Sequence, residues 1–397
     1  MKPTFAAHLL FAVAAARVVG AQGVERQLPS SEATPWSVRF AGAVMARNSE
    51  VHTRWDYTAG VVLLAIDRVA TTHNNKAMRS YVQRNMDRFV QPDGSIAGYR
   101  QDEFNLDQIA QGRLLFPLLS RTGDNRYRKA ARLLRDQLAR HPRTAEGGFW
   151  HKQIYPQQMW LDGLYMAEPF YAQYARTFDE PAALDDVAKQ FLLIARHTRD
   201  PSTGLMYHGW DAAKSQKWAN ADTGLSSAFW GRAMGWYMLG AVDALEFIPR
   251  SHKDRGAVIL TLQQAAEAVT RVQDPVTGLW WQVLDEPNRS GNYLESSASS
   301  MFVYALAKAS RLGYIDIRYR AVASRGFDGL IANFVKTADD GMVSLTSVCQ
   351  VAGLGGSLRK DGSYRDGTFA YYVSEPVVAD DYKGVGPFIM AAHELGR

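Results

Sequence analysis

The chain has 397 residues, of which 47% are hydrophobic and 21% are charged, and it contains a single cysteine. This composition excludes a collagen-like, intrinsically disordered or disulfide-stapled protein. The formal net charge is only +5, and the sequence has no block of five or six basic residues, so we expect no nucleic-acid partner.

The amino terminus is predicted to be a secretory signal peptide over residues 1–21. An apolar run at residues 9–16 follows Lys2, and small residues at Gly20 and Ala21 offer a cleavage site. This run is too short to cross a membrane, and no other run reaches about 18 apolar residues. We therefore expect a secreted protein with no transmembrane helix, with an uncleaved amino-terminal helix as the alternative. Cys349 has no partner cysteine, so core burial alone must hold the mature chain together.

Helical periodicity dominates the rest of the chain. Apolar residues recur at steps of three and four, which is typical of helices with one buried face. Strand-like alternation is limited to a few short stretches, so the sequence predicts an all-α protein. The helical stripes run through residues 59–70, 77–90, 106–119, 127–138, 161–176, 184–195, 228–247, 256–272, 301–312, 317–335 and 384–395.

The loops between alternate helices share one design, in which a turn glycine precedes apolar or aromatic residues. These glycines are spaced 54 to 74 residues apart, which is the length of two helices with their connections. We therefore predict a single domain over residues 22–397, built as a closed ring of six helical hairpins with these loops at one end. This is an (α/α)6 barrel, and an open helical solenoid is the alternative. The glycines are Gly94, Gly148, Gly204, Gly278 and Gly341.

Two carboxylates near the start of predicted helices are candidates for acid–base chemistry. Asp162 follows Trp160 by two residues, and Asp107 precedes the helix predicted from Ile109 to Leu119. Such a carboxylate commonly caps its helix by accepting from free N–H groups. Beside Trp160, however, Asp162 would be desolvated enough to hold its proton and act as a general acid. The helix terminus favours the charged form and apolar burial the neutral form, so the sequence leaves both roles open.

A third cluster combines an arginine with two indoles. Arg232 and Trp236 are four residues apart and share a helix face, and Trp230 precedes them. A buried arginine needs a partner, and an arginine between indoles suits the carboxylate of an acidic sugar. His208 follows the third glycine loop, where it is either a structural residue or part of a site.

Motifs for metal and cofactor binding are missing from the sequence. There is no His-x-x-x-His, Cys-x-x-Cys or acidic calcium loop, and we expect no metal. There is also no Gly-x-Ser-x-Gly elbow and no phosphate-binding loop. The glycine-rich segment from Gly353 to Gly386 is expected to form a loop that closes against the last helix.

These motifs resemble glycoside hydrolase family 105, the unsaturated rhamnogalacturonyl hydrolases. The resemblance extends from about Trp55 through almost all of the mature chain, and the related unsaturated glucuronyl hydrolases are the alternative. It rests on MWLDGLYM at residues 159–166, WGRAMGWY at residues 230–237, and YYVSEP at residues 371–376 together with KGVGPF at residues 383–388.

The resemblance implies an (α/α)6 barrel without metal or cofactor that acts on an acidic oligosaccharide. The substrate ends in a 4,5-unsaturated uronic acid left by a pectin lyase, and the reaction hydrates its double bond. By motif, Asp162 matches the general acid/base and Asp107 the second carboxylate. We also expect a monomer. The residues that match the uronate subsite are Trp160, His208, Trp230, Arg232 and Trp236.

Three other functions fit the same residues. The first is an inverting glycosidase with Asp107 and Asp162 as its acid and base. The second is a polysaccharide lyase in which a tyrosine and His208 abstract a proton while Arg232 neutralises the carboxylate. The third is a glycan-binding scaffold without catalysis, for which Asp162 would be dispensable.

Overall fold

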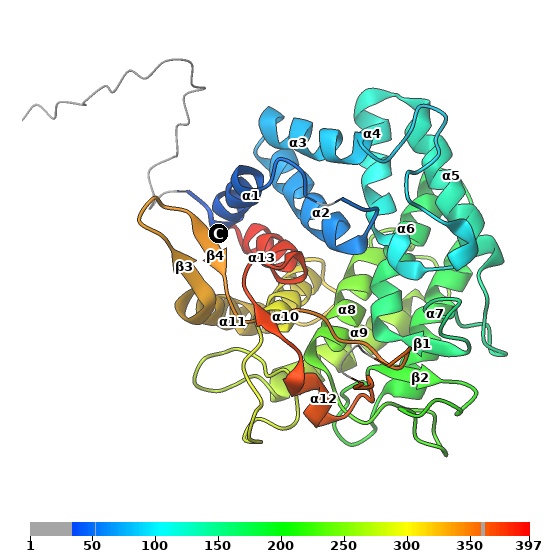
Figure 1. Ribbon diagram of the computed structural model, residues 1–397, viewed down its shortest axis with the longest axis vertical. Helices are drawn as coiled ribbons and strands as arrows, with labels where there is room; N and C mark the ends of the chain where they lie inside the picture. The colour runs from blue at the N-terminus through cyan, green and yellow to red at the C-terminus, as the bar shows by residue number, and fades with distance from the viewer. Residues whose placement is uncertain (1–33, 52, 359–361) are drawn as a thin grey trace, which may run out of the picture. The chain divides into compact units, whose positions relative to one another are not determined.

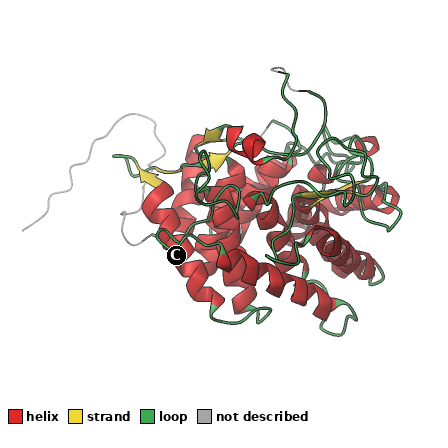
Figure 2. Ribbon diagram, turned by 90° about the horizontal axis from the view of Figure 1, so that it is seen from below, coloured by secondary structure: helices red, strands yellow, loops and turns green. Residues whose placement is uncertain are grey.

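Helices make up most of the computed structural model, which describes residues 34–51, 53–358 and 362–397. The signal peptide predicted at residues 1–21 lies outside these residues. Figure 2 shows short strands and long loops gathered along one side of the helices. Residues 35–397 form one compact unit. No helix of the described residues is both long and apolar enough to span a bilayer.

The inner layer of the described chain is a closed ring of six helical segments, each of which packs against the next. Helices α8 and α10 of this ring are buried on nearly every face, and their sequences carry small and apolar residues on all sides with few charges. The ring can be followed in Figure 1 from blue to red. Its members are α2 (Tyr57–Thr72), η3 with α4 (Ala110–Leu114 and Leu115–Thr122), α6 (Leu161–Thr177), α8 (Gly231–Ala244), α10 (Ser296–Arg311) and α13 (Tyr382–Leu395).

The outer layer covers the ring with amphipathic helices. In α5, for example, Tyr127, Ala130, Leu134 and Leu138 are buried while the opposite face is charged. Each outer helix packs against an inner one. The outer helices are α3 (Lys76–Asp87), α5 (Asn125–Arg140), α7 (Ala183–Thr198), α9 (Arg255–Arg271), α11 (Tyr319–Phe334) and α1 (Trp36–Arg47).

The ring is closed by the first and last helices of the described chain. Helix α1 packs along α13, and the backbone N–H of Ser37 donates to the carbonyl of Arg397 over 3.2 Å. Figure 1 shows this as a blue helix beside a red one. The predicted (α/α)6 barrel is therefore confirmed, with five consecutive hairpins and a sixth pair formed by α1 and α13.

The helix predicted over residues 106–119 is partly wrong. The chain winds instead as 3₁₀ turns in η2 (Leu106–Gln108) and η3, and the α-helix begins only at Leu115. Pro117 has no N–H to donate to the carbonyl of Arg113, so an α-helical hydrogen bond cannot form there. Gly112 also packs so closely on Leu134 and Phe170 that an added Cβ would lie 2.4 Å from Leu134.

The glycine loops lie at the end of the barrel where the inner helices begin. Each follows an outer helix, and its turn glycine has a φ between 74° and 91°, which L-residues rarely adopt. In the second loop this glycine is Gly147, next to the predicted Gly148. The short strands of this part are β1 (Gln158–Trp160) with β2 (Gly209–Asp211), β3 (Val335–Thr337) with β4 (Val343–Leu345), and β5 (Val348–Cys349) with β6 (Val377–Val378).

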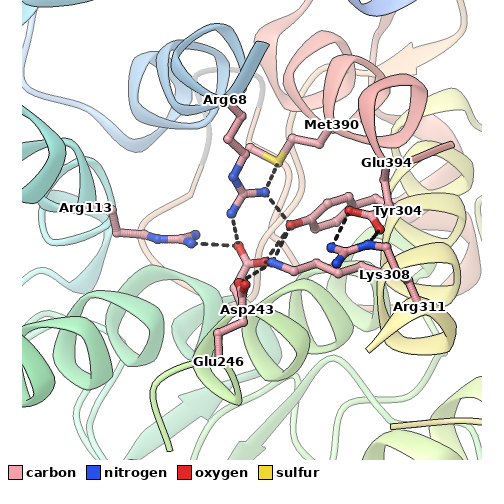
Figure 3. Close-up of polar contacts among 9 residues, drawn as sticks. All are labelled: Arg68, Arg113, Asp243, Glu246, Tyr304, Lys308, Arg311, Met390 and Glu394. Carbon is pink, nitrogen blue, oxygen red and sulfur yellow. Dashed lines mark hydrogen bonds and ion pairs between the residues drawn. The ribbon is translucent and has the colours of Figure 1, made fainter. Parts of the chain in front are cut away.

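The opposite end of the ring is tied together by one fully buried carboxylate, Asp243 of α8 (Figure 3). Arg68 of α2 and Arg113 of η3 contact its Oδ2 at 3.0 and 2.8 Å, and Lys308 of α10 contacts Oδ1 at 2.6 Å. The hydroxyl of Tyr304 donates to the same carboxylate over 2.6 Å. Burial alone would raise the pKa of Asp243, but the three cations outweigh it and hold the pKa well below its usual range.

Candidate active site

Six polar side chains lie at the loop end of the barrel, five from the starts of inner helices and one from η2, the turn that precedes η3. Tyr57 lies among them, since Asp107, Arg232 and Asp162 all act on it electrostatically. Burial raises the pKa of Tyr57 well above its usual value, so this phenol keeps its proton. The six residues are Tyr57 of α2, Asp107 of η2, Asp162 of α6, Arg232 of α8, Glu295 at the start of α10 and Lys383 of α13.

Asp162 forms a pair with His208. Asp162 Oδ2 lies 3.0 Å from His208 Nε2, and the histidine ring is completely buried. On its other side His208 Nδ1 lies 2.7 Å from the Tyr372 hydroxyl. Burial raises the pKa of Tyr372 well above its usual value, so its hydroxyl keeps a proton to donate to Nδ1. That hydrogen bond places the ring proton on Nε2, which lies close to Asp162 Oδ2 without meeting the angle of a hydrogen bond.

Asp107 lies beside a lysine and a histidine ring. Its Oδ2 lies 2.5 Å from Lys152 Nζ, and its Oδ1 lies 3.3 Å from His151 Nε2. Burial would raise the pKa of Asp107, but Lys152 and then His151 outweigh it and hold the pKa far below its usual range. Asp107 is therefore a charged carboxylate.

Trp160 forms a wall beside this pair. Its indole stacks on His151, with ring centroids 4.4 Å apart and planes 16° apart, and on Tyr155 at 4.7 Å. The indole Nε1–H donates to Gln158 over 3.2 Å. Because only 5% of Trp160 is exposed, it holds His151 in place and offers little open ring face to a sugar.

Arg232 is buried beneath Trp230, and its guanidinium lies 4.8 Å from the centre of that ring. Its Nη1 donates to Ser297 and to the carbonyl of Cys349. Burial would lower the pKa of Arg232, but Cys349 and Glu295 outweigh burial and raise this pKa above its usual value. The arginine therefore stays charged. Its Nε has no hydrogen-bond partner among the described residues, which leaves one donor for an anion.

The two tryptophans near Arg232 differ in position. Trp230 lies in the site, stacked on Tyr372 at 5.7 Å with an interplanar angle of 12°. Trp236 lies one turn deeper, packed on Tyr165 at 4.6 Å and edge-on to Tyr57 at 6.1 Å. Trp236 is 1% exposed, so it supports the floor of the site, and the arginine does not lie between two indoles as the spacing suggested.

Sequence reasoning missed several polar residues of the site. Lys383 pairs with Asp381 at 2.8 Å, and burial followed by the charge of Arg232 lowers its pKa. Because the charge of Arg232 lowers the pKa of Lys383, these two cations are close together. Lys152 comes directly after the Gly147 loop, and Tyr57 follows Trp55. Each is a single residue at a helix start or loop end, so no repeated spacing marks it.

An open cavity of about 670 Å³ adjoins Asp107 and Lys152. This volume is within the range of pockets that hold small ligands. Polar and charged side chains predominate in its lining, as a ligand rich in hydroxyl groups requires. The lining includes Arg54, Trp55, Asp56, Arg88, Glu103 and Asn105.

One group among the described residues has the geometry to hold a metal ion, and it contributes nothing to this site. It consists of Asp185, His252 and Asp254, near the outer helices α7 and α9. Lys253 Nζ already lies 3.0 Å from Asp185 Oδ1, so this carboxylate has a cation.

The arrangement can transfer a proton beside a bound carboxylate. Asp162, aligned by His208, is a positioned acid or base. Arg232 and Lys383 supply positive charge for an anionic group. The geometry thus brings Asp162, Asp107, His208, Trp230 and Arg232 to one place, with Trp160 and Trp236 as supports.

Comparisons with known proteins agree with this geometry. Residues 36–397 match the model of Glycosyl Hydrolase Family 88. A solved glycoside hydrolase from family 105 of C. acetobutylicum ATCC 824 has a TM-score of 0.88 and 44% identity, covering 91% of this chain and 99% of that one. Protein Atu3128 of Agrobacterium fabrum (strain C58 / ATCC 33970) is 41% identical, covering 58% of this chain and 97% of its own length. Unsaturated rhamnogalacturonyl hydrolase YesR of Bacillus subtilis (strain 168) is 28% identical, covering 68% of this chain and 75% of its own.

Proposed function

Since this chain belongs to Glycosyl Hydrolase Family 88 and is similar over its length to a family 105 enzyme, it is a glycoside hydrolase of the unsaturated uronyl hydrolase group. We propose that it releases a 4,5-unsaturated uronic acid from the non-reducing end of pectin-derived rhamnogalacturonan oligosaccharides. The observation that carries the proposal is Asp162 Oδ2, held 3.0 Å from His208 at the point where the inner helices begin.

Asp162 would act first as an acid and then as a base. It gives its proton to C4 of the double bond, and positive charge develops at C5 and the ring oxygen. A water molecule adds to C5 and returns a proton to Asp162. The resulting hemiketal opens, and its C1 then releases the neighbouring sugar. Positioned acid–base help of this kind contributes about 10²- to 10⁴-fold in rate.

Arg232 and Lys383 are the candidates for binding the uronate carboxylate. Arg232 has an unpartnered Nε within the described chain, and its charge disfavours the charged form of Lys383. A bound carboxylate would relieve this repulsion, because its negative charge interacts with both cations. The conjugated carboxylate at C5 would then place C4 near the acid.

The similarity to YesR supports rhamnogalacturonan as the source of the substrate. Hydrolysis of unsaturated glucuronyl oligosaccharides is the second candidate, because the same acid, base and carboxylate clamp would serve it. We further propose that the enzyme acts outside the cell, because residues 1–21 have the pattern of a signal peptide. We expect it to act there as a monomer.

The deciding experiment uses purified protein and a panel of lyase-generated oligosaccharides, followed by the ultraviolet absorbance of the alkene. We expect the absorbance to fall only with unsaturated substrates, and fastest with the rhamnogalacturonan disaccharide. Asp162→Asn should lower kcat at least about 10³-fold with the fold intact. Asp328→Asn, at a surface ion pair with Arg397, is the matched control and should retain full activity.

Each rival gives a different result. Hydrolysis of the saturated disaccharide at a similar rate would favour an ordinary glycosidase, and release of the inverted anomer would identify it as inverting. A rise in absorbance on intact polysaccharide would establish a lyase. Binding without product, or full activity of Asp162→Asn, would overturn the assignment of Asp162.

A further inference from the structure

Behind Asp107 lie two buried polar atoms that no described residue satisfies. They are Nδ1 of His151 and Oε2 of Glu168. His151 is 3% exposed and Glu168, in the middle of α6, is 1% exposed. An unsatisfied polar atom at this depth costs about 1–3 kcal/mol, so two near each other call for a shared explanation.

Both residues line the same small void, whose lining residues are all buried. Its volume of about 10 Å³ is close to that needed for one water molecule. Gln190 also lines the void, but its amide is already used. Its Oε1 accepts from the N–H of Phe149 over 2.9 Å, and its Nε2 donates to the carbonyl of Gly147 over 3.0 Å.

The charge state of Glu168 fits a donor. Burial, followed by the charge of Asp186, raises the pKa of Glu168 well above its usual value, and Arg143 opposes this only in part. Glu168 is therefore a neutral acid with an O–H to donate. The groups that face it are Asp186 of α7 and Arg143 of the preceding loop, with Tyr171 on its own helix.

On the other side of the void, His151 connects to the site. Its Nε2 lies 3.3 Å from Asp107 Oδ1. The titratable groups that face this pair are Lys152, at 2.5 Å from Asp107, and the His141 ring, which burial keeps neutral by lowering its pKa to about 4. The Trp160 indole stacked on His151 fixes the plane of its ring.

We propose that Glu168 is a positioning residue that acts on Asp107 through one enclosed water molecule and the His151 ring. The Glu168 O–H donates to the water, and the water donates to His151 Nδ1. This fixes the neutral Nε2–H tautomer, whose N–H is directed at Asp107. Asp107 is then held between this N–H and Lys152 in a single orientation. The importance of this for catalysis rests on the proposed function, in which Asp107 is the second carboxylate of the site.

Two direct observations test the water and the tautomer. A high-resolution crystal structure of the wild-type protein should show one ordered water within hydrogen-bond distance of Glu168 Oε2 and His151 Nδ1. Long-range ¹⁵N–¹H spectra near pH 7 should show His151 protonated at Nε2 alone. An empty void, or a proton on Nδ1, would overturn the proposal whether or not the enzyme hydrates a double bond.

Two substitutions separate a positioning role from a packing role. Glu168→Gln keeps a neutral donor of the same shape, so kcat should stay within about threefold of wild type and His151 should keep its tautomer. Glu168→Leu removes the donor. We expect it to lower kcat about tenfold with KM within twofold, and to give His151 a mixture of ring forms.

The outcomes are distinguishable. Wild-type kcat and spectrum in Glu168→Leu would refute the relay, as would a loss of activity in Glu168→Gln equal to that in Glu168→Leu. If Glu168→Leu does not fold, the wild-type spectrum and Glu168→Gln still decide. If unsaturated oligosaccharides are not consumed at all, the proposed function fails while the tautomer result stands alone.

Discussion

Replacing Asp243 by asparagine tests how the barrel is closed at the end opposite the site. Asp243 is completely buried. It forms ion pairs with Arg68, Arg113 and Lys308, which come from three other segments of the ring. The asparagine side chain has nearly the same shape, so the substitution removes the charge without leaving a cavity. Arg113 and Lys308 then remain buried and Arg68 partly buried, with Glu246, which contacts Lys308, as a compensating charge.

The expected loss follows from the cost of breaking a buried ion pair. Removing one partner typically costs about 3–5 kcal/mol, because the remaining charge is left uncompensated. The unfolding entropy is about 2.1 cal/mol/K per residue, or roughly 0.8 kcal/mol/K for some 360 residues. Asp243→Asn should therefore lower Tm by about 4–7 °C at neutral pH.

Calorimetry at several pH values measures this loss, with Asp328→Asn as the control. Asp328 forms an exposed ion pair, worth at most about 1 kcal/mol, so its Tm should change by little more than 1 °C. Because the folded pKa of Asp243 is depressed, its contribution is present above the unfolded pKa and disappears as pH falls through the folded value. The difference in Tm between wild type and Asp243→Asn should thus become smaller toward acid pH. A Tm within 1 °C of wild type at pH 7 would refute the proposal that the ion pairs of Asp243 stabilise the ring of inner helices.

Other substitutions address the site. Lys152→Met removes the cation that holds the pKa of Asp107 low. The pKa of Asp107 should rise, so kcat/KM should fall below about pH 5 and recover at higher pH. An unchanged acid side of the pH profile of kcat/KM would contradict the pairing of Lys152 with Asp107. In Gly163→Ala the new Cβ would lie 3.3 Å from His151 Nδ1 and 3.2 Å from Leu106, so we expect Tm within about 2 °C of wild type but kcat reduced several-fold in the alkene assay. Equal losses of stability and activity would show that the alanine disturbs packing generally.

The fold could be predicted from apolar spacing because each inner and outer helix presents a regular stripe. The spacing of Val187, Phe191 and Ala195, for instance, marks the buried face of α7. The same signal fails over residues 106–114, where the apolar positions suit a helix but the chain forms 3₁₀ turns before Pro117. Apolar spacing also could not predict the pairing of α1 with α13, because a contact between helices so far apart in the sequence leaves no local pattern.

The site was predictable only where motifs bring chemistry together in the sequence. Asp162 and Arg232 each follow a tryptophan by two residues at a helix start, and both lie in the site. Lys383 and Lys152 were missed because a single lysine has no spacing signature. Glu168 lies within an apolar stripe of α6, where sequence alone gives no sign that it faces a void behind Asp107.

The direction of the inner helices accounts for the different chemistry at the two ends of the barrel. All six begin at the loop end, where unpaired N–H groups and helix dipoles favour negative charge. That end has Asp162, Asp107 and the cations suited to a uronate. The helices finish at the other end, where their dipoles favour cations. There Lys308 lies in the last turn of α10 and Arg68 just before the last turn of α2, and both contact Asp243. Because the tie lies at the far end, Asp243→Asn should lower Tm while leaving the pH dependence of kcat unchanged. A shifted pH profile in that variant would show that the two ends are coupled.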